Sequence, residues 1–109
     1  MTHGVEITIR DKSGKEVTYR QDFVPTQKIL DYLELTPENY PDLDQAGWIK
    51  KNAEFSASIF DDKAVTAQAL LNGVPSWRWD DFTESIAMQV LGIDPKVVQA
   101  ENESASDKQ

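Results

Sequence analysis

Hydrophobic and polar residues alternate with a period of two along the first part of the chain. The apolar members of this alternation are Val5, Ile7 and Ile9, followed beyond a turn by Val17, Tyr19 and Phe23. A period of two is typical of strands with one buried face, and Asp-Lys-Ser-Gly at 11–14 favours a tight turn. Residues 5–23 therefore predict a β-hairpin, which needs helices against its apolar face because a lone hairpin is marginal in water.

After residue 25 the apolar residues recur at the three- and four-residue intervals of amphipathic helices. The expected helices cover about 26–34, 44–60, 66–72, 76–91 and 95–100. Ile29, Leu30 and Leu33 lie on one side of the first expected helix. The core residues expected in the two longest helices are Phe55, Phe60, Phe82 and Ile86.

Residues at the predicted helix ends match known capping preferences. Thr66 is expected to cap the N-terminus of the third helix, and Gly73 to lie just past its C-terminus, where glycine is favoured. Asp80 and Asp81 fall in the first turn of the fourth helix, where the helix dipole favours negative charge. Gly92 is expected to end that helix.

Together these elements predict an α+β fold that is mostly helical, with an N-terminal β-hairpin followed by a compact bundle of short helices. We expect residues 1–100 to form a single domain, since this is a common size for one domain. Residues 101–109 are polar, with Ala105 as the one apolar residue. That stretch is therefore expected to be a disordered acidic tail.

The charge balance narrows the range of expected partners. The chain of 109 residues carries 19 acidic and 11 basic residues, a net charge of -8, and this charge repels nucleic-acid phosphates. It has no cysteine, which rules out disulfides and thiolate metal sites and fits a reducing cytoplasm. The first residues lack the basic and apolar regions of a signal peptide, and no apolar run is long enough to span a membrane. We therefore expect a cytoplasmic protein with neither a nucleic-acid nor a membrane partner.

Candidate catalytic and metal-binding motifs all have simpler structural explanations. Residues 42–47 begin like an EF-hand loop, but its fifth and twelfth positions are alanines where oxygen ligands are required. The carboxylate pairs at 61–62 and 80–81 fall at expected helix starts, where acidic residues occur without any catalytic role. His3 is the one histidine, and no nucleophile or ligand set surrounds it. The sequence therefore predicts no enzyme, no cofactor and no metal.

The stretch Trp-Arg-Trp at 77–79 is the one locally unusual feature. Residues two apart lie about 200° apart around an α-helix, so Trp77 and Trp79 cannot both face the same core. One indole is expected to be buried and the other exposed, and exposed tryptophans are enriched at binding hot spots. We predict that Trp77 and Trp79 contribute to a partner-binding surface. The alternative is that Trp77 covers the neighbouring loop at 74–75.

Residues 48–93 resemble the core of the tail assembly chaperones of long-tailed bacteriophages. The resemblance rests on a helix that ends with Ser-Ile-Phe-Asp-Asp at 58–62, and on Thr-Ala-Gln-Ala-Leu-Leu-Asn-Gly-Val at 66–74. The second stretch is similar to a recurring turn of the family, with a threonine, a leucine pair and then Asn/Asp-Gly. An amphipathic helix follows at 79–92, as it does in the family, whereas 77–79 departs from the more acidic stretch expected there.

The resemblance implies a protein that binds the tape-measure protein, a long helical chain that sets the length of the tail. Such a chaperone keeps the tape-measure protein soluble in the cytoplasm of the bacterial host until the tail-tube protein replaces it. It is absent from the mature virion. The tail-tube protein and a second copy of the chain itself are further partners to consider.

Two other functions stay open from the residues alone. An acidic inhibitor that mimics nucleic acid, of the anti-restriction type, needs its carboxylates arrayed on one face. The acidic residues here are spread through caps, strands and the tail, which argues against that function. A small cytosolic adaptor unrelated to phage is the other alternative.

Overall fold

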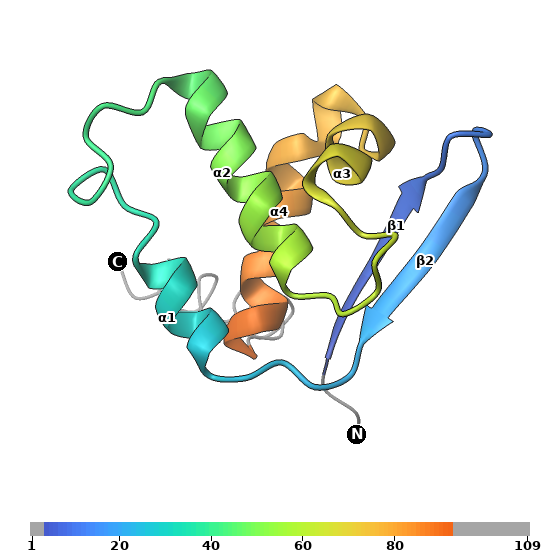
Figure 1. Ribbon diagram of the computed structural model, residues 1–109, viewed down its shortest axis with the longest axis horizontal. Helices are drawn as coiled ribbons and strands as arrows, with labels where there is room; N and C mark the ends of the chain where they lie inside the picture. Colours follow the sequence, from blue (N-terminus) through green and yellow to red (C-terminus); the bar gives the residue numbers. More distant parts are fainter. Residues whose placement is uncertain (1–3, 93–109) are drawn as a thin grey trace, which may run out of the picture.

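The computed structural model describes residues 4–92, in which a two-stranded hairpin lies beside a group of helices (Figure 1). The elements in chain order are β1 (Val5–Arg10), β2 (Glu16–Gln21), α1 (Gln27–Leu33), α2 (Gln45–Ser58), α3 (Ala67–Gly73), the 3₁₀ turn η1 (Ser76–Arg78) and α4 (Trp79–Leu91). The predicted α+β class, with an N-terminal hairpin followed by helices, is confirmed. The helix predicted at 95–100 and the tail at 101–109 lie outside the described residues.

The hairpin is antiparallel, and its register is unbroken along both strands. Its turn is organised by the Asp11 carboxylate, which accepts hydrogen bonds from the Ser13 hydroxyl (2.7 Å), the Ser13 N–H (2.9 Å) and the Lys15 N–H (3.0 Å). These donors, the Ser13 hydroxyl foremost, favour the ionised carboxylate and lower the pKa of Asp11 below its ordinary value of 3.8. Gly14 completes the turn with φ of +86°, a conformation that favours glycine.

β2 ends at Gln21, so the predicted continuation of the strand to Phe23 is wrong. The side-chain amide of Gln21 donates to the Phe23 carbonyl oxygen (3.1 Å) and to the Asp61 carboxylate (3.0 Å). Its carbonyl oxygen accepts a hydrogen bond from the Asp61 N–H (3.0 Å). These bonds attach the end of the hairpin to the loop after α2, and Phe23 lies outside the sheet with 74% of its surface exposed.

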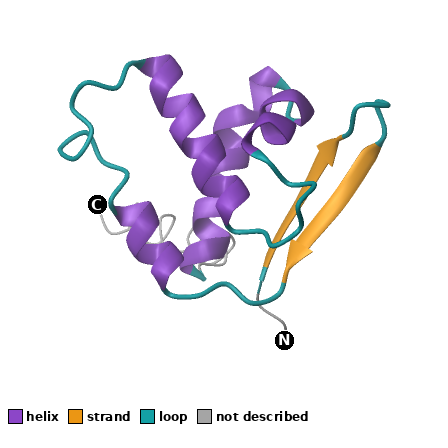
Figure 2. Ribbon diagram, viewed as in Figure 1, coloured by secondary structure: helices purple, strands orange, loops and turns teal. Residues whose placement is uncertain are grey.

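The apolar face of the hairpin forms one wall of the core, because the helices lie to one side of the sheet (Figure 2). Helices α3 and α4 contact β1, and α2 packs on α3 and α4. The buried cluster consists of Val5, Ile7, Ile9, Ile59, Phe60, Val65, Leu70, Ile86 and Val90. Phe60 and Ile86 are buried as predicted. Phe55 and Phe82 are partly buried and pack against this cluster.

Helix α1 buries only part of its apolar surface. Ile29 packs against the core, and the ring of Tyr32 lies 5.8 Å from that of Phe55 on α2. Leu30 and Leu33 are 51% and 57% exposed. Of the three apolar residues on that side of the helix only Ile29 is covered, because α1 touches the other helices with the side that carries Ile29 and Tyr32.

Gly73 is required for close packing of a helix on a strand. It is the last residue of α3 and does not have the left-handed conformation expected of a glycine past the helix end. A Cβ atom at this position would lie 2.6 Å from the Arg10 carbonyl oxygen and 3.0 Å from the Ile9 Cβ. The predicted capping role is therefore wrong, and glycine occurs here because α3 approaches β1 too closely for a side chain.

Three other predicted features of helix ends are confirmed. The Thr66 hydroxyl oxygen accepts a hydrogen bond from the Ala69 N–H at 3.0 Å. Asp80 and Asp81 lie in the first turn of α4. Gly92 ends that helix in the left-handed conformation, with φ of +72°.

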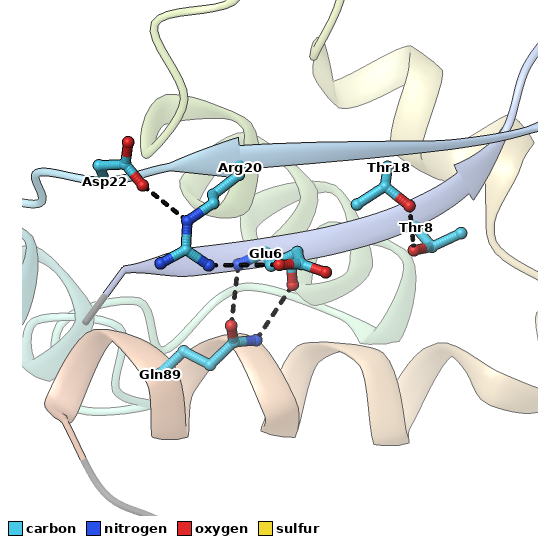
Figure 3. Close-up of polar contacts among 6 residues, drawn as sticks. All are labelled: Glu6, Thr8, Thr18, Arg20, Asp22 and Gln89. Carbon is cyan, nitrogen blue, oxygen red and sulfur yellow. Dashed lines mark hydrogen bonds and ion pairs between the residues drawn. The ribbon is translucent and has the colours of Figure 1, made fainter. Parts of the chain in front are cut away.

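A glutamine on α4 binds the edge of β1 that faces away from β2 (Figure 3). The Glu6 N–H donates to Gln89 Oε1 at 2.9 Å, and Gln89 Nε2 donates to the Glu6 carbonyl oxygen at 3.3 Å. The Gln89 amide thus supplies the two bonds that a neighbouring strand would supply. These bonds fix the hairpin relative to α4.

Candidate protein-binding surface

The backbone between α3 and α4 places Trp77 and Trp79 on different elements. The Arg78 N–H donates to the Pro75 carbonyl oxygen at 2.9 Å, which closes the single 3₁₀ turn η1. Arg78 has φ of −112° and ψ of 4°, outside helical geometry, and α4 begins only at Trp79. The predicted continuous helix over 76–91 is therefore wrong at its first turn.

Trp77 projects into solvent, whereas Trp79 packs at the margin of the core. Trp77 is 83% exposed. Trp79 stacks on Phe82 with ring centroids 5.6 Å apart and an angle of 27° between the planes. The structure thus separates the two indoles, and an exposed indole leaves a large, rigid apolar surface free to bind a partner. The role of Trp77 and Trp79 in partner binding stays a prediction.

A groove of about 470 Å³ with a mixed apolar and polar lining opens between α2, α3 and α4, next to η1. Its apolar lining residues are Trp48, Ile49, Leu71, Val74 and Trp79, and its polar lining residues are Gln45, Asn52, Ser76, Asp80 and Thr83. Trp77 follows directly after Ser76, a groove residue. We call Trp77 together with these lining residues the Trp77 surface.

An aromatic contact fixes the wall of the groove that α2 provides. The ring of Tyr40 meets Trp48 edge to face, with centroids 6.2 Å apart and an angle of 83° between the planes. Lys51 Nζ lies 4.8 Å from the centroid of the same tyrosine ring, within the range of a cation–π contact. The loop that precedes α2 therefore holds Trp48 in place, so the groove has a defined shape without a ligand.

Charged side chains lie at the edge of this surface. A second hollow, of about 260 Å³, lies between β1 and α4, and Val74 lines both it and the groove. Asp80 lines the groove, whereas Arg78 and Asp81 line the second hollow. The Trp77 surface thus combines apolar side chains with carboxylates at the start of α4, which suits a partner with an apolar stripe and basic flanks.

The described part of the chain holds no cluster that resembles a catalytic or metal centre. No group of three or more His, Cys, Asp or Glu side chains in residues 4–92 could hold a metal ion. Asp61 binds Gln21, and the Asp62 carboxylate accepts a hydrogen bond from the Ala64 N–H at 2.9 Å, so both have structural partners. No helix within 4–92 has the length and apolarity needed to cross a bilayer.

The sequence does not single out the groove residues of α2 and α3 as a site. One signal could have found two of them. The helix expected at 44–60 carries a broad apolar stripe that includes Trp48 and Ile49, and these two residues line the groove. A stripe of excess width indicates a second contact surface on the same helix.

These features define a small α+β protein with an exposed indole at Trp77 and a groove between three of its helices. A model of the family described as "phage tail chaperone protein" matches residues 2–108. Because this match spans almost the whole chain, the chain belongs to that family, whose role in tail assembly is not catalytic. No curated protein and no solved structure gives a significant match.

Proposed function

We propose that this tail assembly chaperone binds the tape-measure protein and keeps it soluble while the tail is assembled. It acts in the cytoplasm of the bacterial host and is left out of the mature virion, after the tail-tube protein has taken its place. The observation that carries the proposal is the exposure of Trp77, 83%, directly after Ser76, which lines the groove. Membership of the tail chaperone family supports tail proteins as the class of partner.

The shape of the Trp77 surface favours a helical partner. A tape-measure protein is a long helical chain with apolar stripes, and exposed stripes of that kind lead to aggregation. An amphipathic helix can place one row of apolar side chains in a groove between helices. The groove between α2 and α4 offers Trp48 and Ile49 on one wall and Trp79 on the other.

The charge of the chain supports the same function. Its net charge is -8, so each bound copy adds negative charge to the complex. Like-charged complexes repel one another, which keeps them dispersed until assembly.

Co-expression with the tape-measure protein of the same phage tests this proposal. The chain should keep the tape-measure protein in the soluble fraction and co-purify with it. Trp77→Ala should reduce co-purification without changing the melting temperature, because an exposed side chain contributes little to stability. Phe23→Ala is the matched control, since Phe23 is an exposed aromatic residue away from the groove. Equal recovery of the complex with both variants would contradict the proposal.

A further inference from the structure

The outer edge of β2 carries backbone groups that have no partner in residues 4–92. Glu6 directs its N–H and C=O to Gln89 on α4, away from β2. Arg20 lies opposite Glu6, so it directs its backbone groups away from β1. Because this direction alternates along a strand, Thr18 and Glu16 do the same. No hydrogen bond of the described residues reaches these groups. β2 is also the outermost strand in the structure (Figure 1).

Two of the features that usually prevent pairing, a proline and a bulge, are absent from this edge. β2 contains no proline, and its pairing with β1 runs without a bulge over all six residues. Gln89 closes part of the free edge of β1, but no described residue does the same for β2. An edge of this kind is a template for a further strand.

We propose that two copies of this chain associate through β2, with the strands antiparallel about a two-fold axis at Thr18. In this register Thr18 lies opposite Thr18 of the second copy, and Glu16 lies opposite Arg20. All three outward residues then pair, giving about six intermolecular hydrogen bonds, because each hydrogen-bonded pair of an antiparallel ladder exchanges two. The two hairpins become one continuous four-stranded sheet.

Charges on the outer face of the hairpin select this register. Within one copy Glu6 lies opposite Arg20, with Arg20 Nη1 3.2 Å from Glu6 Oε2 (Figure 3), and Arg10 lies opposite Glu16. In the four-stranded sheet, a row of four charged side chains crosses the strands on either side of the axis. Each row consists of Glu6 and Arg20 of one copy followed by Glu16 and Arg10 of the second copy, so negative and positive charges alternate along it. Registers that place Glu16 opposite Glu16, or Arg20 opposite Arg20, bring like charges together and are disfavoured.

The apolar face of the hairpin is continuous in the same arrangement. Val17 and Tyr19 of β2 are only half-buried in one copy, unlike the residues of β1. About the axis at Thr18, Val17 lies opposite Tyr19 of the second copy in a pair without hydrogen bonds, where side chains come closest. Ile7 and Ile9 already lie opposite these two residues within each copy. An apolar row therefore crosses all four strands.

Sedimentation equilibrium of the full-length chain, with two charge reversals, tests the proposal. The unsubstituted chain should form a dimer, and Glu16→Arg or Arg20→Glu should raise its dissociation constant about tenfold or more, because each reversal creates two like-charged pairs. An equimolar mixture of the two variants should dimerise again, since each Arg then faces a Glu across the axis. An unsubstituted chain that stays monomeric at about 1 mM, the weak end of specific association, would overturn the proposal. So would reversals without effect or a mixture that stays monomeric.

A backbone substitution keeps the test decisive if the charge reversals disturb the fold of the hairpin. Thr18→Pro removes an N–H that points away from β1, where proline is tolerated in an edge strand. Thr18→Val is its matched control, because it also loses the side-chain bond to Thr8 (2.8 Å) but keeps the N–H. The proline variant should be monomeric and the valine variant dimeric. If both variants are dimeric, or if both are monomeric, the proposed axis is overturned. None of these measurements involves the tape-measure protein, so their outcome is independent of the proposed function.

Discussion

Alanine substitution of two helical glycines should change stability in opposite directions. At Gly73 a Cβ atom would lie 2.6 Å from the carbonyl oxygen of Arg10, and backbone atoms cannot move aside as a side chain can. At Gly47, in the first turn of α2, the nearest atom is Cδ2 of Leu43 at 2.7 Å, the flexible end of a side chain. The overlap at Gly73 can be relieved only by moving α3 away from β1. The overlap at Gly47 is relieved by a rotation of the Leu43 side chain.

The expected magnitudes follow from these contacts. Overpacking costs about 1–3 kcal/mol, and alanine recovers at most about 1 kcal/mol of helix propensity. Gly73→Ala should therefore lower the free energy of unfolding by about 1–2 kcal/mol, a drop in melting temperature of about 5–15 °C for a domain of this size. Gly47→Ala should raise the free energy of unfolding by about 0.5–1 kcal/mol, because the unfolded chain loses freedom and a rotation of Leu43 relieves the overlap in the folded state.

Urea and thermal unfolding of the two variants and the unsubstituted chain provide the measurement. Both variants make the same chemical change in a helix, so the difference between them isolates the contact of α3 with β1. If Gly73→Ala stabilises the chain as Gly47→Ala does, α3 and β1 are not in the close contact described, and the reasoning is refuted.

Three further predictions concern the core and the hairpin. Phe60→Ala should cost about 3–5 kcal/mol in a urea melt, whereas Phe82→Ala, at a half-buried position, should cost about half as much. Gln89→Ala should cost about 1 kcal/mol, because it leaves a strand edge unpaired, while Gln68→Ala, whose amide meets only Asn72 at 3.3 Å, should stay within about 0.5 kcal/mol. The lowered pKa of Asp11 stabilises the fold above its ordinary pKa of 3.8, and this contribution is lost as the pH falls through the lowered pKa. Urea melts in acid should show Asp11→Asn to be less sensitive to pH than the unsubstituted chain.

Local signals in the sequence predict much of the fold. The alternation of Val5, Ile7 and Ile9 defines β1, because a strand with one buried face imposes that period directly. Thr66 and Gly92 mark helix ends through bonds and backbone angles formed within a few residues. Such features depend on neighbours in the chain and can be read from it.

Features that depend on distant parts of the chain could not be predicted in the same way. Gly73 looks like a helix stop in the sequence, but its role is set by Arg10, far away along the chain. Leu30 and Leu33 lie on an apolar stripe, yet only tertiary packing decides which side of α1 is covered. Gln89 carries no signal in the sequence, because its bonds to β1 exist only once α4 is in place.

The candidate binding surface also has one feature that the sequence predicts and others that it does not. The spacing of Trp77 and Trp79 predicts that their indoles separate, since that follows from local geometry. Which of the two is exposed depends on the 3₁₀ turn after Pro75, and the sequence pattern reads this turn as part of a helix. The groove beside Trp77 needs three helices to form and has no local signature.

Titration calorimetry with a fragment of the tape-measure protein tests the central claim most directly. The full-length chain should bind the fragment, and Trp77→Ala should weaken binding by about 2 kcal/mol, or about 30-fold, as expected for a hot-spot residue. Phe23→Ala should bind as the unsubstituted chain does, because its exposed ring lies outside the groove. An equal affinity for the Trp77→Ala variant and the unsubstituted chain would contradict the account, as would a fragment that the unsubstituted chain does not bind.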